Sequence, residues 1–245
     1  MDNHSRLKIE NKLKNNLYIN IIVDIIMAFI HTCLSTYIRL FASQMNNDLY
    51  NHLKRNLIEK IEGKCFEDYG YVSKIYGIVE KSGGIIRAED TSASAEFHVK
   101  FSCKMSIPIK GKQIICEIGR MNKELLGATN GPFKIFIPID NDRINKAIFK
   151  IDHNGNIKYM LNGEEKKLSS KDFVKVTLMS YTFNAGDDFI ATICSLDNIA
   201  SKEDIEEYSK ILYDENPSDL VDIKEFTDGI RGEEISYKKS LGDDY

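Results

Sequence analysis

The chain has 245 residues, of which 42% are hydrophobic, and this is enough for one or two domains. Its formal net charge of −4 argues against a protein held on nucleic acid mainly by bulk electrostatic attraction. The charge is uneven: residues 201–245 hold six Lys and Arg against fourteen Asp and Glu, a net of −8, which leaves residues 1–200 at +4. A mildly basic body is therefore followed by an acidic segment, which we expect to be a solvated or disordered tail.

The cysteine pattern and the apolar pattern exclude two further classes of protein. The five cysteines are widely separated, with no C-x-x-C pair and no Cys/His cluster, so we expect no metal site and a reducing compartment. Residues 17–30 (LYINIIVDIIMAFI) are mostly apolar, but Asn20 and Asp24 interrupt the run. The longest uncharged stretch, 25–38, is shorter than the ~20 residues that span a bilayer, so we expect no membrane attachment.

The first half of the chain predicts a helix lying across a small antiparallel sheet, within residues 27–109. Leucine and isoleucine recur every four residues from Leu49 to Ile61, which predicts a helix that ends at Gly63. Alternation of apolar side chains is clearest between Phe97 and Ile107, as in a half-buried antiparallel strand. The strands predicted in this half are 33–41, 69–81, 84–88 and 95–109.

The second half predicts a small barrel within residues 110–200. Short runs of β-branched and aromatic residues are separated by turn signals such as Asn154-Gly155 and Asn162-Gly163. About five such strands joined by hairpins suit an OB-type barrel. The predicted strands are 112–121, 124–129, 133–138, 148–151, 157–161, 173–184 and 188–196, and two helices are predicted around 201–214 and 217–228.

No motif for catalysis is present. The sequence has no phosphate-binding glycine loop, no G-x-S-x-G and no H-E-x-x-H, and its five histidines are dispersed, so we expect no catalytic residue, no cofactor and no enzyme activity. An OB barrel binds single strands through basic side chains and aromatic faces. The candidates for such contacts are Lys123, Phe133, Lys134, Phe136, Arg143, Lys175 and Tyr181.

Some of these candidates have a simpler explanation. Phe136 lies between Ile135 and Ile137, and the same spacing is compatible with a place in the core. Lys123 and Lys134 are equally compatible with solvated strand ends.

Three motifs in the same order carry a family resemblance over about residues 27–200. Leu40 to Val72 (LFASQMNNDLYNHLKRNLIEKIEGKCFEDYGYV) contains E-G-x-C-x-x-x-Y-G-Y-V; IKGKQIICEIGRMNK and GPFKIFIP follow, and then VKVTLMSYTFNAGDDFIATICSLD. Together they resemble the stalk subunit of eukaryotic RNA polymerase II (subunit seven) and its archaeal counterpart. The matching positions are Glu62, Gly63, Cys65, Tyr69, Gly70, Tyr71, Val72, Lys110, Gly111, Asn122, Lys123, Gly131, Pro132, Phe136 and Ile137.

The resemblance implies a fold, a function and partners. The expected fold is α+β and mostly β: an N-terminal helix-on-antiparallel-sheet tip domain followed by a C-terminal OB-fold barrel. The expected function is that of a non-catalytic stalk subunit of a multi-subunit DNA-directed RNA polymerase, which docks on the core subunits, pairs with a subunit-four-like partner and contacts nascent RNA. The alternative is a free-standing OB-fold RNA-binding protein in translation or RNA decay.

The resemblance also suggests domain bounds and docking residues. The expected divisions are an extension of doubtful role (1–26), a polymerase-docking domain (27–109), an OB-fold domain (110–200) and an acidic tail (201–245). Glycines allow close backbone approach, and aromatic side chains are frequent in interfaces, although a tight turn needed only for folding would use the same residues. The expected docking residues are Gly63, Cys65, Phe66, Tyr69 and Gly70.

Two positions depart from the family pattern. Phe41-Ala42 stands where a histidine-proline pair is usual, and residues 124–128 lack the usual aromatic strand residue, which favours weak RNA contact.

The Asn, Ile and Lys bias suggests a large DNA virus. We therefore expect the protein to accompany its polymerase in the virion and host cytoplasm if viral, or in the nucleus if cellular.

Overall fold

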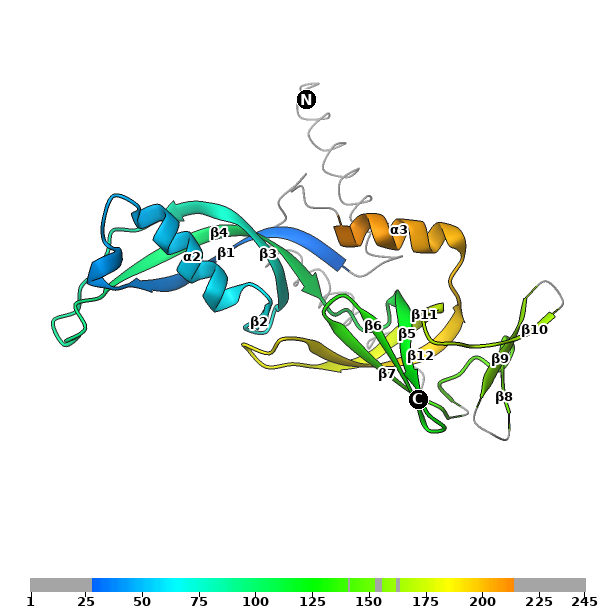
Figure 1. Ribbon diagram of the computed structural model, residues 1–245. Helices are drawn as coiled ribbons and strands as arrows, with labels where there is room; N and C mark the ends of the chain where they lie inside the picture. The colour runs from blue at the N-terminus through cyan, green and yellow to red at the C-terminus, as the bar shows by residue number, and fades with distance from the viewer. Residues whose placement is uncertain (1–27, 141, 153–155, 162–163, 214–245) are drawn as a thin grey trace, which may run out of the picture. The chain divides into compact units, whose positions relative to one another are not determined.

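The computed structural model describes residues 28–140, 142–152, 156–161 and 164–213, which form two compact units (Figure 1). The sheet unit contains Phe29–Ile107 and Phe183–Asp188. The barrel unit contains Pro108–Thr182 and continues from Phe189 through the last described helix. The proposed extension 1–26 and the helix predicted around 217–228 lie outside the described residues.

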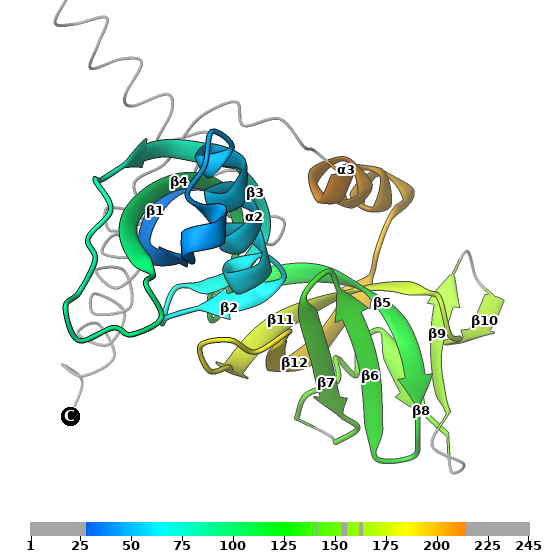
Figure 2. The ribbon, with the colours of Figure 1, turned by 60° about the vertical axis from the view of Figure 1, so that its left-hand side comes forward.

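The sheet unit is a four-stranded sheet with a helix over one face (Figures 1 and 2). The strand order is β1-β4-β3-β2. The helix α2 covers the residues whose periodicity predicts it, and its stripe of Leu53, Leu57 and Ile61 is buried. The elements are β1 (Ala28–Leu40), the short 3₁₀ helix η1 (Ala42–Gln44), α2 (Leu49–Ile61), β2 (Lys64–Phe66), β3 (Gly70–Lys81) and β4 (Ala95–Ile107).

Polar side chains of α2 also satisfy carbonyl groups of the edge strand β1. Asn56 Nδ2 donates to Arg39 O at 3.1 Å, and Lys60 Nζ donates to Tyr37 O at 2.7 Å. An edge strand has a row of backbone groups without ladder partners, and these bonds use part of that row. The helix is therefore fixed on the sheet by its apolar stripe and by polar contacts at one side.

The barrel unit contains a closed five-stranded barrel of order β11-β12-β7-β6-β5, which confirms the predicted barrel. Its neighbours are antiparallel except for β12 and β7, which run parallel. Five strands closed in this way fit an OB-type barrel. The strands are β5 (Gln113–Met121), β6 (Leu125–Asn130), β7 (Phe133–Pro138), β11 (Phe173–Thr182) and β12 (Ile190–Ile199).

Helix α3 (Lys202–Tyr213) packs on the outside of this barrel. Tyr208 is buried, and its ring centroid lies 6.1 Å from that of Phe173. Burial raises the pKa of Tyr208 to about 12. The contact with α3 explains why Ile114, Ile115 and Cys116 of β5 are all buried, since the strand is covered on both faces. The first residues of the acidic segment thus belong to a packed helix.

A second, three-stranded sheet of order β10-β9-β8 forms a separate lobe of the barrel unit (Figure 1). Its strands are β8 (Phe149–Ile151), β9 (Ile157–Leu161) and β10 (Glu164–Lys167). Both pairings are antiparallel. Phe149 is buried, with its ring edge-on to Tyr159 at 6.4 Å between centroids, so one face of this small sheet is turned inward.

The predicted strand 84–88 is wrong. Only a single bridge, between Ile85 and Glu96, forms there, and Ile85 and Ile86 remain 64% and 65% exposed. Gly83 and Gly84 precede them and disfavour a continued strand. Two strands escaped prediction: β2 has only three residues, and the four side chains of β10 are all exposed, so neither shows apolar alternation.

Candidate nucleic-acid and docking surfaces

The outer surface of β7 presents two of the predicted RNA-contacting residues together. Lys134 is exposed and Phe136 is 37% exposed, while Ile135 and Ile137 between and beside them are buried. The core placement considered for Phe136 is therefore wrong, because the alternating strand turns its ring outward.

Parallel pairing with β12 brings further side chains beside these two. Ile193 is in register with Phe136 and is 40% exposed. The Lys134 ammonium lies 3.5 Å from the centroid of the Phe189 ring, a cation–π contact. We call Lys134, Phe136, Phe189 and Ile193 the barrel patch. It combines one positive charge with two exposed rings, the chemistry that binds single strands without regard to sequence.

The other predicted RNA-contacting residues lie in different settings. Tyr181 is 39% exposed, and Lys110 Nζ lies 5.7 Å from its ring centroid. Lys175 Nζ is 2.7 Å from Asp204 Oδ2 of α3, so its charge is already paired. Arg143 Nε lies 3.7 Å from Asp140 Oδ2, a partly exposed pair. Lys123 is exposed in the turn between β5 and β6, whereas Phe133 is fully buried.

The predicted docking residues gather around the β2–β3 connection, but Cys65 does not reach the surface. Cys65 is buried, and burial, with smaller contributions from Asp187 and Asp188, raises the pKa of its thiol to about 11. Its backbone N–H donates to Asp187 O at 2.7 Å, and its carbonyl accepts from Gly186 N at 2.8 Å. Cys65 therefore belongs to the core and to a backbone pairing with residues 183–188.

The turn after β2 is the part of this region that projects outward. Tyr69 N donates to Phe66 O at 3.1 Å, which closes the turn, and Glu67 at its corner has a φ of +46°. Glu67 and Asp68 are exposed, while Phe66 and Tyr69 are half-buried with their rings stacked at 6.4 Å between centroids. Both aromatic residues thus keep part of their surface available.

The two glycines have separate structural roles. Gly63 has a φ of +76°, and its N–H donates to Val72 O at 2.9 Å, which turns the chain from α2 into β2. Gly70 has a φ of +142°, and a Cβ there would overlap the backbone carbonyl oxygen of Ser106. The close approach that requires glycine at this position is thus made to β4 of the same sheet.

Glu62 also has a structural role that its motif position does not reveal. Its Oε2 accepts a hydrogen bond of 2.8 Å from the backbone N–H of Ile75, between two irregularities in the pairing of β3 with β4. An irregular strand leaves such donors without a ladder partner, and the carboxylate replaces it.

We expect Glu62→Ala to lower the free energy of unfolding by about 1–3 kcal/mol, because a part-buried backbone donor loses its acceptor. Urea denaturation monitored by circular dichroism would measure this difference. Glu62→Gln is the matched control, since its amide oxygen can accept the same bond, and it should stay close to wild type. Equal loss in both variants would mean that the charge, and not this bond, matters.

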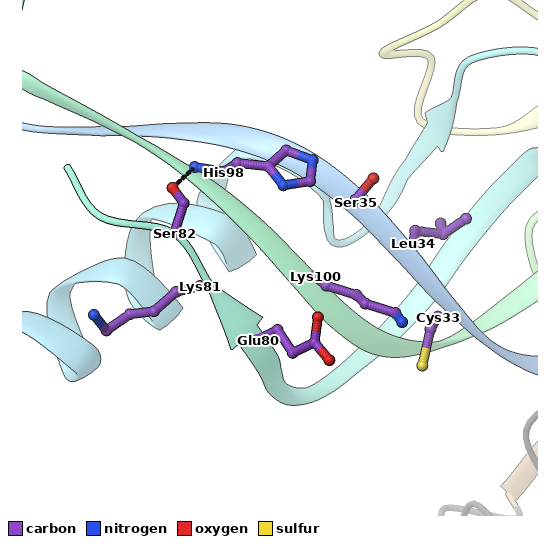
Figure 3. A pocket seen from close by; sticks show the side chains of 8 residues that line it. All are labelled: Cys33, Leu34, Ser35, Glu80, Lys81, Ser82, His98 and Lys100. Carbon is purple, nitrogen blue, oxygen red and sulfur yellow. Dashed lines mark hydrogen bonds between the residues drawn. The ribbon is translucent and has the colours of Figure 1, made fainter. Parts of the chain in front are cut away.

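The face of the sheet opposite α2 is polar and partly hollow. The apolar row of β4 (Phe97, Val99 and Phe101) is buried, so the intervening His98 and Lys100 point to the other side and are exposed. A hollow of about 510 Å³ lies there (Figure 3). It is lined by Cys33, Leu34, Ser35, Glu80, Lys81, Ser82, His98 and Lys100.

The thiols and acidic groups do not assemble into a centre in the part of the chain that the structure describes. Within these ranges no group of three or more His, Cys, Asp or Glu residues is placed to hold a metal ion. Burial raises the pKa of Cys103 to about 12 and of Cys194 to about 11, and raises that of Cys116 as well. No described helix is both long and apolar enough to cross a membrane.

Sequence reasoning missed Phe189 and Ile193 as members of the barrel patch. Both lie more than 50 positions from Lys134 and Phe136 along the chain, and only the parallel pairing of β12 with β7 makes them neighbours. The sequence carries no signal for Ile193, which is as apolar as the buried Ile190; only the burial pattern of β12 places it on the outer face.

Comparison with known proteins gives consistent matches. Residues 35–91 match a domain family described as the SHS2 domain found in the N terminus of Rpb7p/Rpc25p/MJ0397. A DNA-directed RNA polymerase subunit of Acanthamoeba polyphaga mimivirus is 33% identical over 171 residues, which cover 70% of this chain and 83% of that protein.

Cellular relatives match over shorter spans. RNA polymerase II subunit 7 of Arabidopsis thaliana is 34% identical over 90 residues, 35% of this chain and 50% of that protein. RPB7 of Saccharomyces cerevisiae is 29% identical over 105 residues, 42% of this chain and 60% of that protein. The alignment thus spans about half of these cellular relatives but most of the viral one. With its barrel and its N-terminal match, the chain belongs to the RPB7-like family of DNA-directed RNA polymerase subunits.

Proposed function

We propose that this chain is the non-catalytic stalk subunit of a multi-subunit RNA polymerase of a large DNA virus, with a tip in the sheet unit that docks on the polymerase core and a barrel that contacts the transcript. The observation that carries the proposal is one chain combining the matched N-terminal domain with a closed five-stranded barrel. The long match to a mimivirus polymerase subunit supports the viral assignment. The protein would then accompany the polymerase in the virion and host cytoplasm. If the polymerase were cellular, the protein would be located in the nucleus.

The proposed contact with the polymerase core is the turn 66–69. It contains fewer residues than the five docking residues that the sequence predicts. Cys65 and Gly70 are occupied by contacts within the sheet unit, so they support the turn and do not form its surface. Phe66 and Tyr69 are stacked and half-exposed, and Glu67 and Asp68 between them carry negative charge. Aromatic side chains held in this way lose little conformational entropy on binding and are frequent at the energetic centre of interfaces.

The test is recovery of the polymerase core with the affinity-tagged full chain, measured by quantitative mass spectrometry. Tyr69→Ala should weaken the association by about 2 kcal/mol or more, roughly thirtyfold, if Tyr69 is a central interface residue. Tyr50→Ala is the matched control, because Tyr50 is an exposed tyrosine of the same unit on α2. Equal recovery by Tyr69→Ala and wild type would exclude this turn. Recovery of ribosomal or RNA-decay proteins, with no polymerase subunit, would favour a free-standing RNA-binding protein instead.

A second polypeptide, equivalent to polymerase subunit four, is proposed to cover the polar face of the sheet. The apolar row of β4 needs no such partner, because Phe97, Val99 and Phe101 are already buried in the sheet unit. The uncovered surface is the opposite face, with the hollow and the exposed Tyr37 and Lys100. The same affinity purification would reveal such a partner as a stoichiometric second small subunit.

Nascent RNA is proposed to bind the barrel patch with modest affinity. Lys134, Phe136 and Phe189 supply one charge and two rings, while the charges of Lys175 and Arg143 are paired with carboxylates. Few free charges imply few phosphate contacts, and therefore a weak dependence of affinity on salt.

A further inference from the structure

The lobe of β8, β9 and β10 carries three lysines in a single row across its strands. Lys150 of β8 pairs in register with Lys158 of β9, and Lys158 pairs with Lys167 of β10. Residues directly opposite one another in antiparallel strands point to the same side, with Cβ atoms about 4.5–5.5 Å apart. Three positive charges thus lie within about 10 Å, the width of three strands.

The row lies on the outward face of the lobe. The neighbouring row contains Phe149, Tyr159 and Lys166. Phe149 is buried, so this side of the sheet is turned inward at β8, while Lys166 at the edge strand β10 is exposed. Alternation places Lys150, Lys158 and Lys167 on the other side, where Lys150 and Lys167 are exposed. Met160, also on this side, is 55% exposed.

Like charges opposite one another destabilise a sheet, and this row is only partly compensated. Within the three strands as described, the acidic residue on the lysine face is Glu165, whose Oε2 lies 3.4 Å from Lys158 Nζ. Both members of that pair are solvent-accessible, at 36% and 47% of their side-chain surface, so the pair contributes little. Lys150 and Lys167 flank it and add two further charges, against which Asp152, two residues after Lys150, is the next acidic residue along the chain.

We propose that the lysine row is a second RNA-binding surface, which holds the phosphate backbone of a single strand apart from the barrel patch. A line of three ammonium groups is complementary to a chain with one negative charge per nucleotide, and the exposed Met160 beside it offers an apolar contact for a base. The site recognises the charge of the phosphates and not the base sequence. It has no aromatic ring on which a base could stack and no rigid pair of hydrogen-bond donors that could select one base. The inference rests on the proposed RNA contact of this subunit and adds a second point on the path of the strand.

The test measures binding of a 5′-fluorescein-labelled oligouridylate to the full chain by anisotropy over a series of salt concentrations. Lys150→Gln/Lys167→Gln removes two charges from the row. The slope of log affinity against log salt should become less negative by roughly 1.4, since each neutralised phosphate of a single strand contributes about 0.7. This corresponds to an about sevenfold smaller loss of affinity between 50 and 200 mM salt.

Two controls separate this site from the others. Lys166→Gln removes an exposed lysine of the same strand that lies on the other side of the sheet, so it should leave the slope unchanged. Phe136→Ala alters only the barrel patch, so it should weaken binding but keep the slope. If Phe136→Ala weakens binding while the double variant behaves as wild type, the lysine row has no RNA role although the proposed function stands. The row would then serve only to protect the edge strands β8 and β10 from aggregation.

Two further outcomes would also overturn the inference. If wild type does not bind the oligouridylate even at low salt, both the lysine row and the RNA contact of the barrel are excluded. If labelled polyglutamate of matched charge binds the chain, and the double variant abolishes that binding but leaves the binding of the oligouridylate unchanged, the row is a site for an acidic protein segment and not for RNA.

Discussion

Gly70→Ala is expected to destabilise the sheet unit by about 3 kcal/mol or more, because alanine meets two penalties at this position. A φ of +142° lies in a region that L side chains rarely adopt, and the added Cβ would overlap the carbonyl oxygen of Ser106. That oxygen belongs to the central strand β4, so relief requires β3 and β4 to separate. In a unit of this size the midpoint of thermal unfolding should fall by roughly 12 °C or more.

Gly77→Ala provides the control for this prediction. Gly77 lies in the same strand, and a Cβ there would meet only the Tyr50 hydroxyl at 3.9 Å, an ordinary contact. Differential scanning calorimetry of both variants should therefore show a large shift for Gly70→Ala and a small one for Gly77→Ala. An unfolding midpoint of Gly70→Ala equal to that of wild type would mean that β3 does not approach β4 this closely at position 70.

Phe136→Ala is expected to reduce affinity for single-stranded RNA by about 1–3 kcal/mol, the usual contribution of one stacked base. The ring is 37% exposed on the outer face of the barrel, so its removal should leave folding almost unchanged. Anisotropy titration with labelled oligouridylate at low salt would show a loss of roughly 5-fold to 150-fold.

The adjacent Ile193 separates stacking from simple apolar contact. Ile193 is in register with Phe136 and is 40% exposed, but it has no aromatic face. Ile193→Ala should therefore bind nearly as wild type, and Phe136→Tyr should retain affinity because the ring remains. If Ile193→Ala and Phe136→Ala lose affinity equally, the contact is apolar only. If neither substitution changes the affinity for RNA, RNA does not bind the barrel patch.

The sequence alone determined the features that depend on local periodicity. Four-residue recurrence of Leu and Ile defined α2, and alternation from Phe97 to Phe101 defined which side of β4 is buried, although residues 103–107 are buried on both sides. The motif around Glu62 and Gly70 and the succession of short strands were enough to indicate the family and the barrel. These features follow from backbone geometry over a few residues, so neighbouring side chains encode them.

The tertiary structure decided which residues are neighbours. Alternation was compatible with either side for Phe136, and only closure of the barrel, with β12 beside β7, placed its ring outside next to Ile193. The glycine at position 70 is required by a carbonyl of β4, 36 residues away in the chain. The lysine row likewise depends on the register of three strands. One of them, β10, has no apolar residue from which the sequence could predict it. Strand pairing is a long-range choice set by burial of the whole core, and no short segment specifies it.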